Sequence, residues 1–101
     1  MVKIDLDRIP NQMFNIMLEN VLYRVQLRTI QGLTYMSVWA NNEVLFYSQL
    51  CCPNIFVNPY NYVGIGGKFL FSCIDNEYPN YEKFGNTQEL LFYSAEEIAN
   101  A

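Results

Sequence analysis

Apolar and polar residues alternate one by one through much of the first fifty positions, in short runs separated by turn-forming residues. In the longest run, residues 21–29, apolar side chains stand at odd positions up to Leu27, while Arg24, Gln26 and Arg28 stand between them. Successive side chains of a β-strand point to opposite faces, so this period of two predicts a strand with one dry and one solvated face. A chain built from such runs is expected to fold into sheets.

The turn residues between the runs predict a meander. Glu19-Asn20 and Asn41-Asn42 separate neighbouring runs, and asparagine tolerates the positive φ that tight hairpin turns require. Pro10 ends the first short run because proline lacks the N–H that a strand ladder needs. The strands predicted in this half are 2–6, 14–18, 21–29, 34–40 and 44–50.

The second half is less regular. Strands are expected at 68–74 and 90–94, and long irregular loops at 51–67 and 75–89, where proline and glycine interrupt the sequence without hydrophobic periodicity. Residues 95–101 form a short tail that can take one helical turn. The sequence therefore predicts a single all-β domain over 1–101, either a small antiparallel β-barrel or a two-sheet sandwich of about six to seven strands, since alternation fits both.

Composition narrows the classes of partner. The chain has 101 residues, of which 51% are hydrophobic and 16% charged, enough apolar material for one core and the opposite of a disordered composition. A net charge of −4 lacks the basic excess that binding to nucleic acid or anionic membranes needs. No apolar run is long enough to span a membrane, and residues 1–9 do not resemble a signal peptide. We expect protein partners and a cytosol-like compartment.

The residues that usually carry catalysis or bind metal are poorly represented. The chain has no histidine, which removes the usual serine and cysteine triads and most zinc sites. The glycine-rich stretch 64–68 lacks the spacing of a phosphate-binding loop. Cys51, Cys52 and Cys73 are odd in number and are interpreted as buried, reduced thiols. We therefore expect no enzymatic activity, no cofactor and no metal site.

Aromatic residues gather in the two predicted loops, where function often resides. Tyrosine suits protein interfaces because it combines a large apolar area with a hydrogen-bonding tip, although such rings can also fold over the chain's own core or hold a small ligand. The loop residues in question are Tyr60, Tyr62, Tyr78, Tyr81 and Phe84.

Three predicted strands are apolar at successive positions, 44–47, 69–71 and 90–93, so both of their faces are apolar. Only one face of each can reach the core of so short a chain, and the other must be covered by a loop or a neighbouring subunit. The interface predicted from the loops and these strands comprises Tyr60, Tyr62, Tyr78, Tyr81, Phe84, Leu45, Tyr47 and Tyr93.

The order of several residues along nearly the whole chain resembles the small baseplate plug domain of contractile-tailed bacteriophages. These residues are Ile9-Pro10 with Gln12 and Phe14, then Leu18, Tyr23 and Leu27, the strand 35–39, Gly67 before an apolar strand, and Phe84-Gly85 ahead of Leu90 and Tyr93.

The resemblance implies a structural virion protein of the tail baseplate without an active site. It would pack against the central hub and the start of the tail tube, plug or line the axial region, and bridge neighbouring subunits. Its implied partners are the hub, the tube initiator and the wedge, together with copies of itself, and it would assemble in the host cytoplasm. The alternative is a β-rich carbohydrate-binding or adaptor module at a tail tip.

Overall fold

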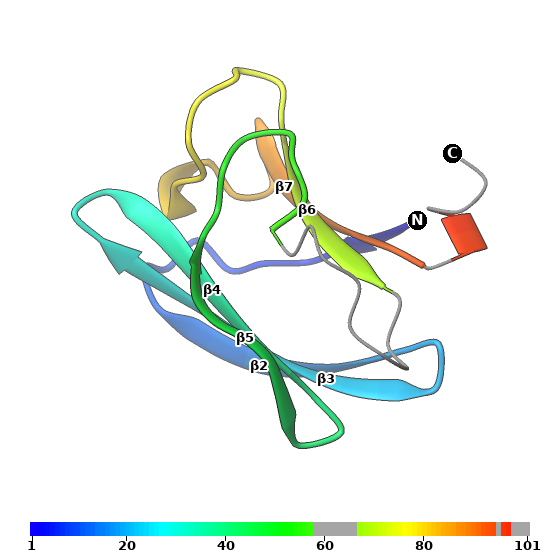
Figure 1. The fold of residues 1–101 in the computed structure, drawn as a ribbon. Coiled ribbons are helices and arrows are strands. Elements are labelled where there is room, and N and C mark those ends of the chain that lie inside the picture. Colours follow the sequence, from blue (N-terminus) through cyan, green and yellow to red (C-terminus); the bar gives the residue numbers. More distant parts are fainter. Residues whose placement is uncertain (58–66, 95, 98–101) are drawn as a thin grey trace.

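The computed structural model describes residues 1–57, 67–94 and 96–97. It shows two antiparallel sheets in separate layers, with strand orders β1-β7-β6 and β2-β3-β4-β5 (Figure 1). The sheets do not close into a barrel, so of the two predicted architectures the sandwich is confirmed. The elements are β1 (Val2–Ile4), β2 (Gln12–Leu18), β3 (Val21–Ile30), β4 (Leu33–Ala40), β5 (Glu43–Leu50), β6 (Lys68–Cys73), the 3₁₀ turn η1 (Tyr81–Lys83) and β7 (Gln88–Tyr93).

The four-stranded sheet is the predicted meander, and each of its hairpins has a two-residue turn with positive φ at both positions. Such mirror-image turns match the right-handed twist of the strands that they join. They fix the pairing so that each strand has a defined inner and outer face. The turn residues are Glu19 (φ 51°) with Asn20 (65°), Gln31 (51°) with Gly32 (78°), and Asn41 (49°) with Asn42 (71°).

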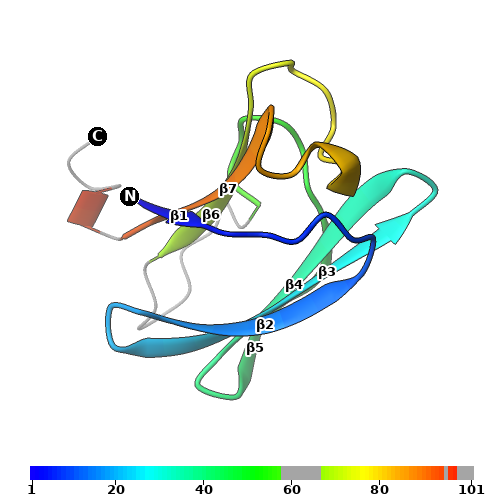
Figure 2. The same cartoon turned by 180° about the vertical axis from the view of Figure 1, so that it is seen from behind.

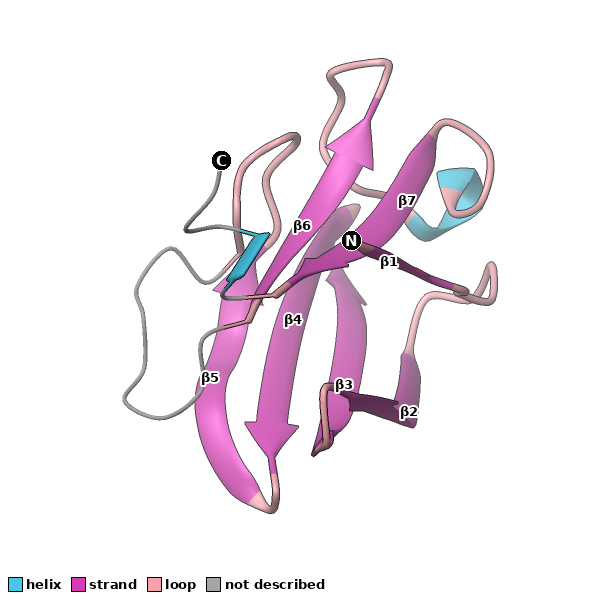
Figure 3. Cartoon of the chain, turned by 90° about the vertical axis from the view of Figure 1, so that its right-hand side faces the viewer, coloured by secondary structure: helices cyan, strands magenta, loops and turns pink. Residues whose placement is uncertain are grey.

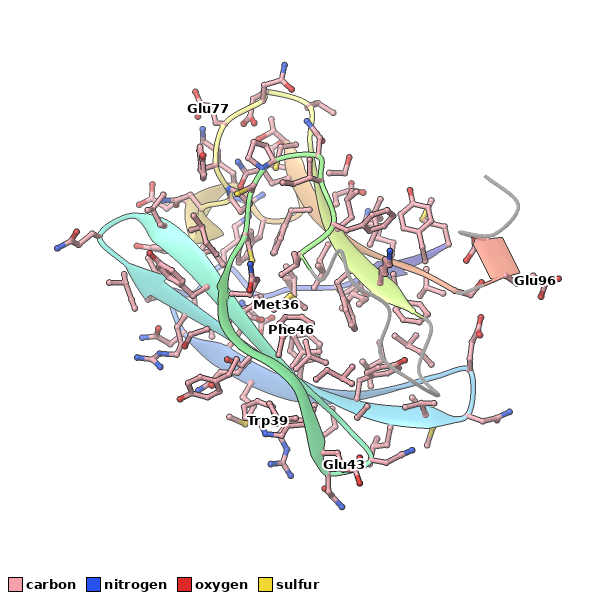
Figure 4. The ribbon with its side chains drawn as sticks, viewed as in Figure 1. Met36, Trp39, Glu43, Phe46, Glu77 and Glu96 are labelled. Carbon is pink, nitrogen blue, oxygen red and sulfur yellow. The ribbon has the colours of Figure 1, made fainter. Side chains whose placement is uncertain are left out.

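Pairing between β3 and β4 brings the core positions of the two strands side by side. Val25 lies opposite Val38 and Leu27 opposite Met36, and each of these side chains is 1% exposed or less. Figure 4 shows Met36 and Phe46 directed into the space between the sheets, while Trp39 points away from it. The predicted division into a dry and a solvated face therefore holds for this sheet.

Strand β5 has apolar side chains on both faces, as predicted for 44–47, but it departs from simple alternation: Val44 and Tyr47 are exposed, and the two residues between them are buried. Its pairing with β4 shifts register twice, and the successive residues Leu45 and Phe46 are both buried. Ser48 has a positive φ of 51°, and its N–H donates to Ser37 Oγ at 2.8 Å. Bulges of this kind turn two neighbouring side chains toward one face. Leu45 thus belongs to the core.

The three-stranded sheet covers the meander with its aromatic inner face, in which Phe69, Phe71 and Phe92 are almost fully buried. Figure 3 shows β6 and β7 together with the strands of the opposite sheet. Part of the predicted loop 51–67 lies along β6, where the N–H of Val57 donates to the Phe69 carbonyl at 2.8 Å. The rest of that loop, from residue 58 to residue 66, lies outside the described residues.

The closing strand begins earlier than predicted, which shortens the predicted loop 75–89. Gln88 is the first residue of β7, and its side chain is fully buried although it is polar. Its Oε1 accepts from the Asn80 N–H at 2.7 Å, and its Nε2 donates to the Tyr78 carbonyl at 3.2 Å. Backbone groups of the preceding loop thus form the hydrogen bonds that the buried Gln88 side-chain amide needs. This is why a polar residue can occupy a core position.

The remaining loop is tied to both sheets. Thr34 Oγ1 on β4 donates to the Pro79 carbonyl at 2.8 Å, and Arg8 Nε donates to the Phe84 carbonyl at 2.9 Å. Arg8 lies in the segment that crosses from β1 to β2, visible in blue in Figure 2. The loop is therefore anchored at several points along its length.

The predicted tail at 95–101 is described only at Glu96 and Glu97, which are helical. Ser94 and Glu97 form a reciprocal cap, in which each backbone N–H donates to the other side chain, at 3.0 and 3.1 Å. The Met1 amino group pairs with the Glu97 carboxylate, which joins the two ends of the described chain.

Gly67 is predicted to be essential for the packing between the sheets. A Cβ at this position would overlap the ring of Phe92, and Phe92 is confined by Tyr23 and Phe69. Gly67→Ala should therefore lower the free energy of unfolding by about 1–3 kcal/mol in a urea titration. Adding Phe92→Leu, which removes the clashing ring atoms, should make the double substitution less costly than the sum of the two. Strict additivity would contradict this contact.

Candidate functional site

The described parts of the chain do not bring together the groups of a catalytic or metal centre. Within them, no cluster of three or more His, Cys, Asp or Glu residues could hold a metal ion. A pocket of about 170 Å³ lies beside β1 and β7, but the charges that line it include Lys3 and Glu89, which pair with each other at 3.2 Å. No helix in the described ranges is long and apolar enough to span a membrane.

The three cysteines are free thiols, as the sequence suggested. Cys51 and Cys73 are 1% exposed or less, as expected, whereas the expected burial of Cys52 is wrong, because this residue is partly exposed. Burial raises the pKa of Cys51 strongly, and the neighbouring thiols Cys52 and Cys73 raise it further. Burial also raises the pKa of Cys73 to about 11, and the charge of Asp75 adds to this shift. The thiolate is the reactive form, so both buried cysteines are poor nucleophiles.

Large exposed side chains concentrate instead on the outer face of β2–β5, which we call the outer sheet face. Among the described residues, it carries six of the twelve large apolar side chains that are exposed. So many apolar groups on one flat surface are typical of an interaction site. The six are Met13, Met17, Leu22, Ile30, Val44 and Tyr47.

Trp39 lies at the centre of this face because the register places it between Arg24 on β3 and Val44 on β5. The Arg24 guanidinium lies 5.9 Å from the centre of the Trp39 ring, and Tyr47 meets the same ring edge to face at 6.2 Å. An arginine and two aromatic side chains are residue types enriched at protein interfaces. Here they hold one another in place.

The residues predicted as an interface are dispersed by the fold. Tyr47 is 61% exposed on the outer sheet face, and Tyr78 is 50% exposed on the loop before β7. Tyr81 is partly buried against the core, and Tyr93 packs edge to face on Phe56 at 5.8 Å.

Four of the predicted residues offer no surface that the structure describes. Leu45 is buried by the β5 bulge, and Phe84 stacks on Phe71 at 5.6 Å with 1% of its surface exposed. These two residues contribute to the core of the chain. Tyr60 and Tyr62 lie outside the described residues.

Sequence reasoning missed the centre of the outer sheet face. Trp39, Leu22 and Val44 were not among the predicted interface residues. The alternation nevertheless implies that Trp39 faces away from the core, because the preceding Val38 faces into it, and the same holds for Leu22 before Tyr23. Extending the alternation from one strand to its neighbours would have shown that these residues share a face.

Comparison with protein families gives a match over residues 1–96 to the family described as "Cyanophage baseplate Pam3 plug gp18". The chain belongs to this baseplate plug family. The search of curated proteins found no match.

Membership in the plug family gives the chain a structural role in the baseplate of a phage tail. It also implies contact with other baseplate or tail proteins. The family is a structural one, and nothing found here indicates enzymatic activity.

Thiol labelling tests the described environment of the cysteines. In the folded plug protein at mildly alkaline pH, a thiol reagent should modify Cys52 quickly and Cys51 and Cys73 slowly, because burial keeps those two thiols protonated and shielded. Peptide mass spectrometry identifies the modified residues, and all three should react in urea. Rapid modification of Cys51 in the folded protein would contradict its buried position.

Proposed function

We propose that the chain packs against the central hub and the start of the tail tube, where it plugs or lines the axial region and bridges neighbouring subunits. The outer sheet face is the principal contact in this proposal, and Tyr78 extends the contact from the loop before β7. Assembly takes place in the host cytoplasm, where free thiols remain reduced.

The observation that carries this proposal is the exposure of apolar side chains around Trp39. Val44 is 58% exposed, Met17 61% and Leu22 43%, while the inward-facing core residues of β3 and β4, such as Val25 and Val38, are fully buried. Burying apolar area contributes roughly 25 cal/mol per Å², so covering this face by a neighbour favours assembly. Because the chain belongs to a baseplate plug family, the neighbour that covers this face is expected to be another baseplate or tail protein.

The sheet is also suited to transmit load. Its strands are held by antiparallel pairing from β2 to β5, interrupted by the bulge in β5, and by three two-residue turns. A preformed surface loses little conformational entropy on binding, which favours a lasting contact. Such a contact fits a subunit that joins neighbours in an axial position.

The proposal predicts that Leu22→Ser combined with Val44→Ser prevents incorporation into particles. Both side chains are exposed, so the free energy of unfolding should change by less than about 0.5 kcal/mol. Particles that lack the natural chain are supplied with the variant, and its amount in purified particles is measured by quantitative mass spectrometry. Incorporation should fall by about tenfold or more, which corresponds to roughly 1.4 kcal/mol of lost contact free energy.

Ile74→Ser and Ile55→Ser provide a matched control, because both residues are exposed aliphatic side chains outside the outer sheet face. The control variant should enter particles at the normal level. Normal incorporation of the Leu22 and Val44 variant would contradict the proposed packing. Loss of carbohydrate binding by intact particles would favour a binding module instead.

A further inference from the structure

The outer sheet face has a charge pattern that differs from that of the chain as a whole. The protein has 10 acidic and 6 basic residues, but Arg24 and Arg28 both project from this face. Only two acidic residues, Glu19 and Glu43, occur between residues 12 and 50, and both lie at hairpin turns. Between its turns the face therefore carries apolar, aromatic, neutral polar and cationic side chains but no acidic one.

The two arginines have no carboxylate partner within the described part of the chain, where the ion pairs involve Met1, Lys3 and Lys83. Arg24 is held over Trp39 instead. The residues are four positions apart on one strand, which separates their backbones by roughly 13 Å. The two cations stand on either side of Gln26. Trp39 lies opposite Arg24, with Val44 next to it on β5, and Tyr35 lies opposite Arg28.

From this pattern we propose that the outer sheet face docks on an acidic surface of a different tail protein, with carboxylates opposite Arg24 and Arg28 and apolar groups against Trp39 and Val44. This inference rests on the proposed packing function and adds the chemistry of the partner. Carboxylates pair with guanidinium groups through two parallel hydrogen bonds, which fixes the orientation of docking as well as its strength.

Charge complementarity also decides against a second copy seated face to face. In a two-fold contact the same surface meets itself, so the four guanidinium groups of two copies would gather at one interface, while the carboxylates of Glu19 and Glu43 lie at the hairpin turns. Like charges brought together at an interface are unfavourable and select against the wrong partner. The occupant is therefore a surface of opposite charge on another protein.

Charge reversal tests the proposal in whole particles. Arg24→Glu with Arg28→Glu should reduce the copies of the chain per particle by at least about tenfold, because carboxylates would then face carboxylates. The single variants Arg24→Glu and Lys3→Glu change the net charge by the same amount, but Lys3 lies outside the outer sheet face. Lys3→Glu should therefore leave incorporation normal. Thermal unfolding checks that each variant is folded.

A second double variant, Arg24→Gln with Arg28→Gln, removes the charges without reversing them. It should give a smaller loss of incorporation into particles. Selecting restored particles from the Glu variant should yield replacements of Asp or Glu by Lys or Arg in a different tail protein. Suppressors in the acidic residues of this same chain would overturn the proposal in favour of a second copy.

The outcomes separate this inference from the proposed function. Normal incorporation of the folded arginine variants, together with failure of the Leu22 and Val44 variant, would overturn only the acidic partner. Normal incorporation of both would overturn the packing function as well.

Discussion

The two sheets are held together by side chains, and three aromatic rings form the centre of this contact. Tyr23 of β3 meets Phe69 at 5.6 Å and Phe92 at 5.6 Å, and those two rings meet each other at 5.3 Å. Edge-to-face contacts of this kind add to the free energy gained by burying the rings. Burial and the nearby carboxylate of Glu19 raise the pKa of Tyr23, so its hydroxyl stays neutral inside the cluster.

The position of Tyr23 in this cluster also determines what the molecule presents to its neighbours. Because alternate residues of a strand face opposite ways, an inward Tyr23 forces Leu22 and Arg24 outward. Pairing with β4 then places Trp39 outward beside Arg24. A shift of one residue would exchange the core for the outer sheet face, so the same register specifies the core and the surface proposed for docking.

The meander could be predicted from sequence because its signals are local: the period of two and the turn pairs Glu19-Asn20 and Asn41-Asn42. The β5 bulge could not be predicted, because it involves a hydrogen bond from the Ser48 N–H to the Ser37 hydroxyl of the neighbouring strand β4. Gln88 was missed for a similar reason. Its polarity suggests a loop, and only its partners in the folded chain explain why it is buried in a strand.

The candidate site was only partly predicted because the interface residues were chosen mainly for their aromatic side chains and not for their places on the aligned strands. Phe84 was expected in an interface on account of its ring, yet it contributes to the core, whereas Trp39 acquires its exposed neighbours only when three strands are aligned. The loop aromatics need many side-chain and backbone contacts to hold their positions. The sheet holds Trp39, Arg24 and Tyr47 through its backbone pairing, and a surface fixed in this way meets a partner with little loss of entropy. The sheet is therefore better suited than the loop aromatics to the contact proposed for this baseplate subunit.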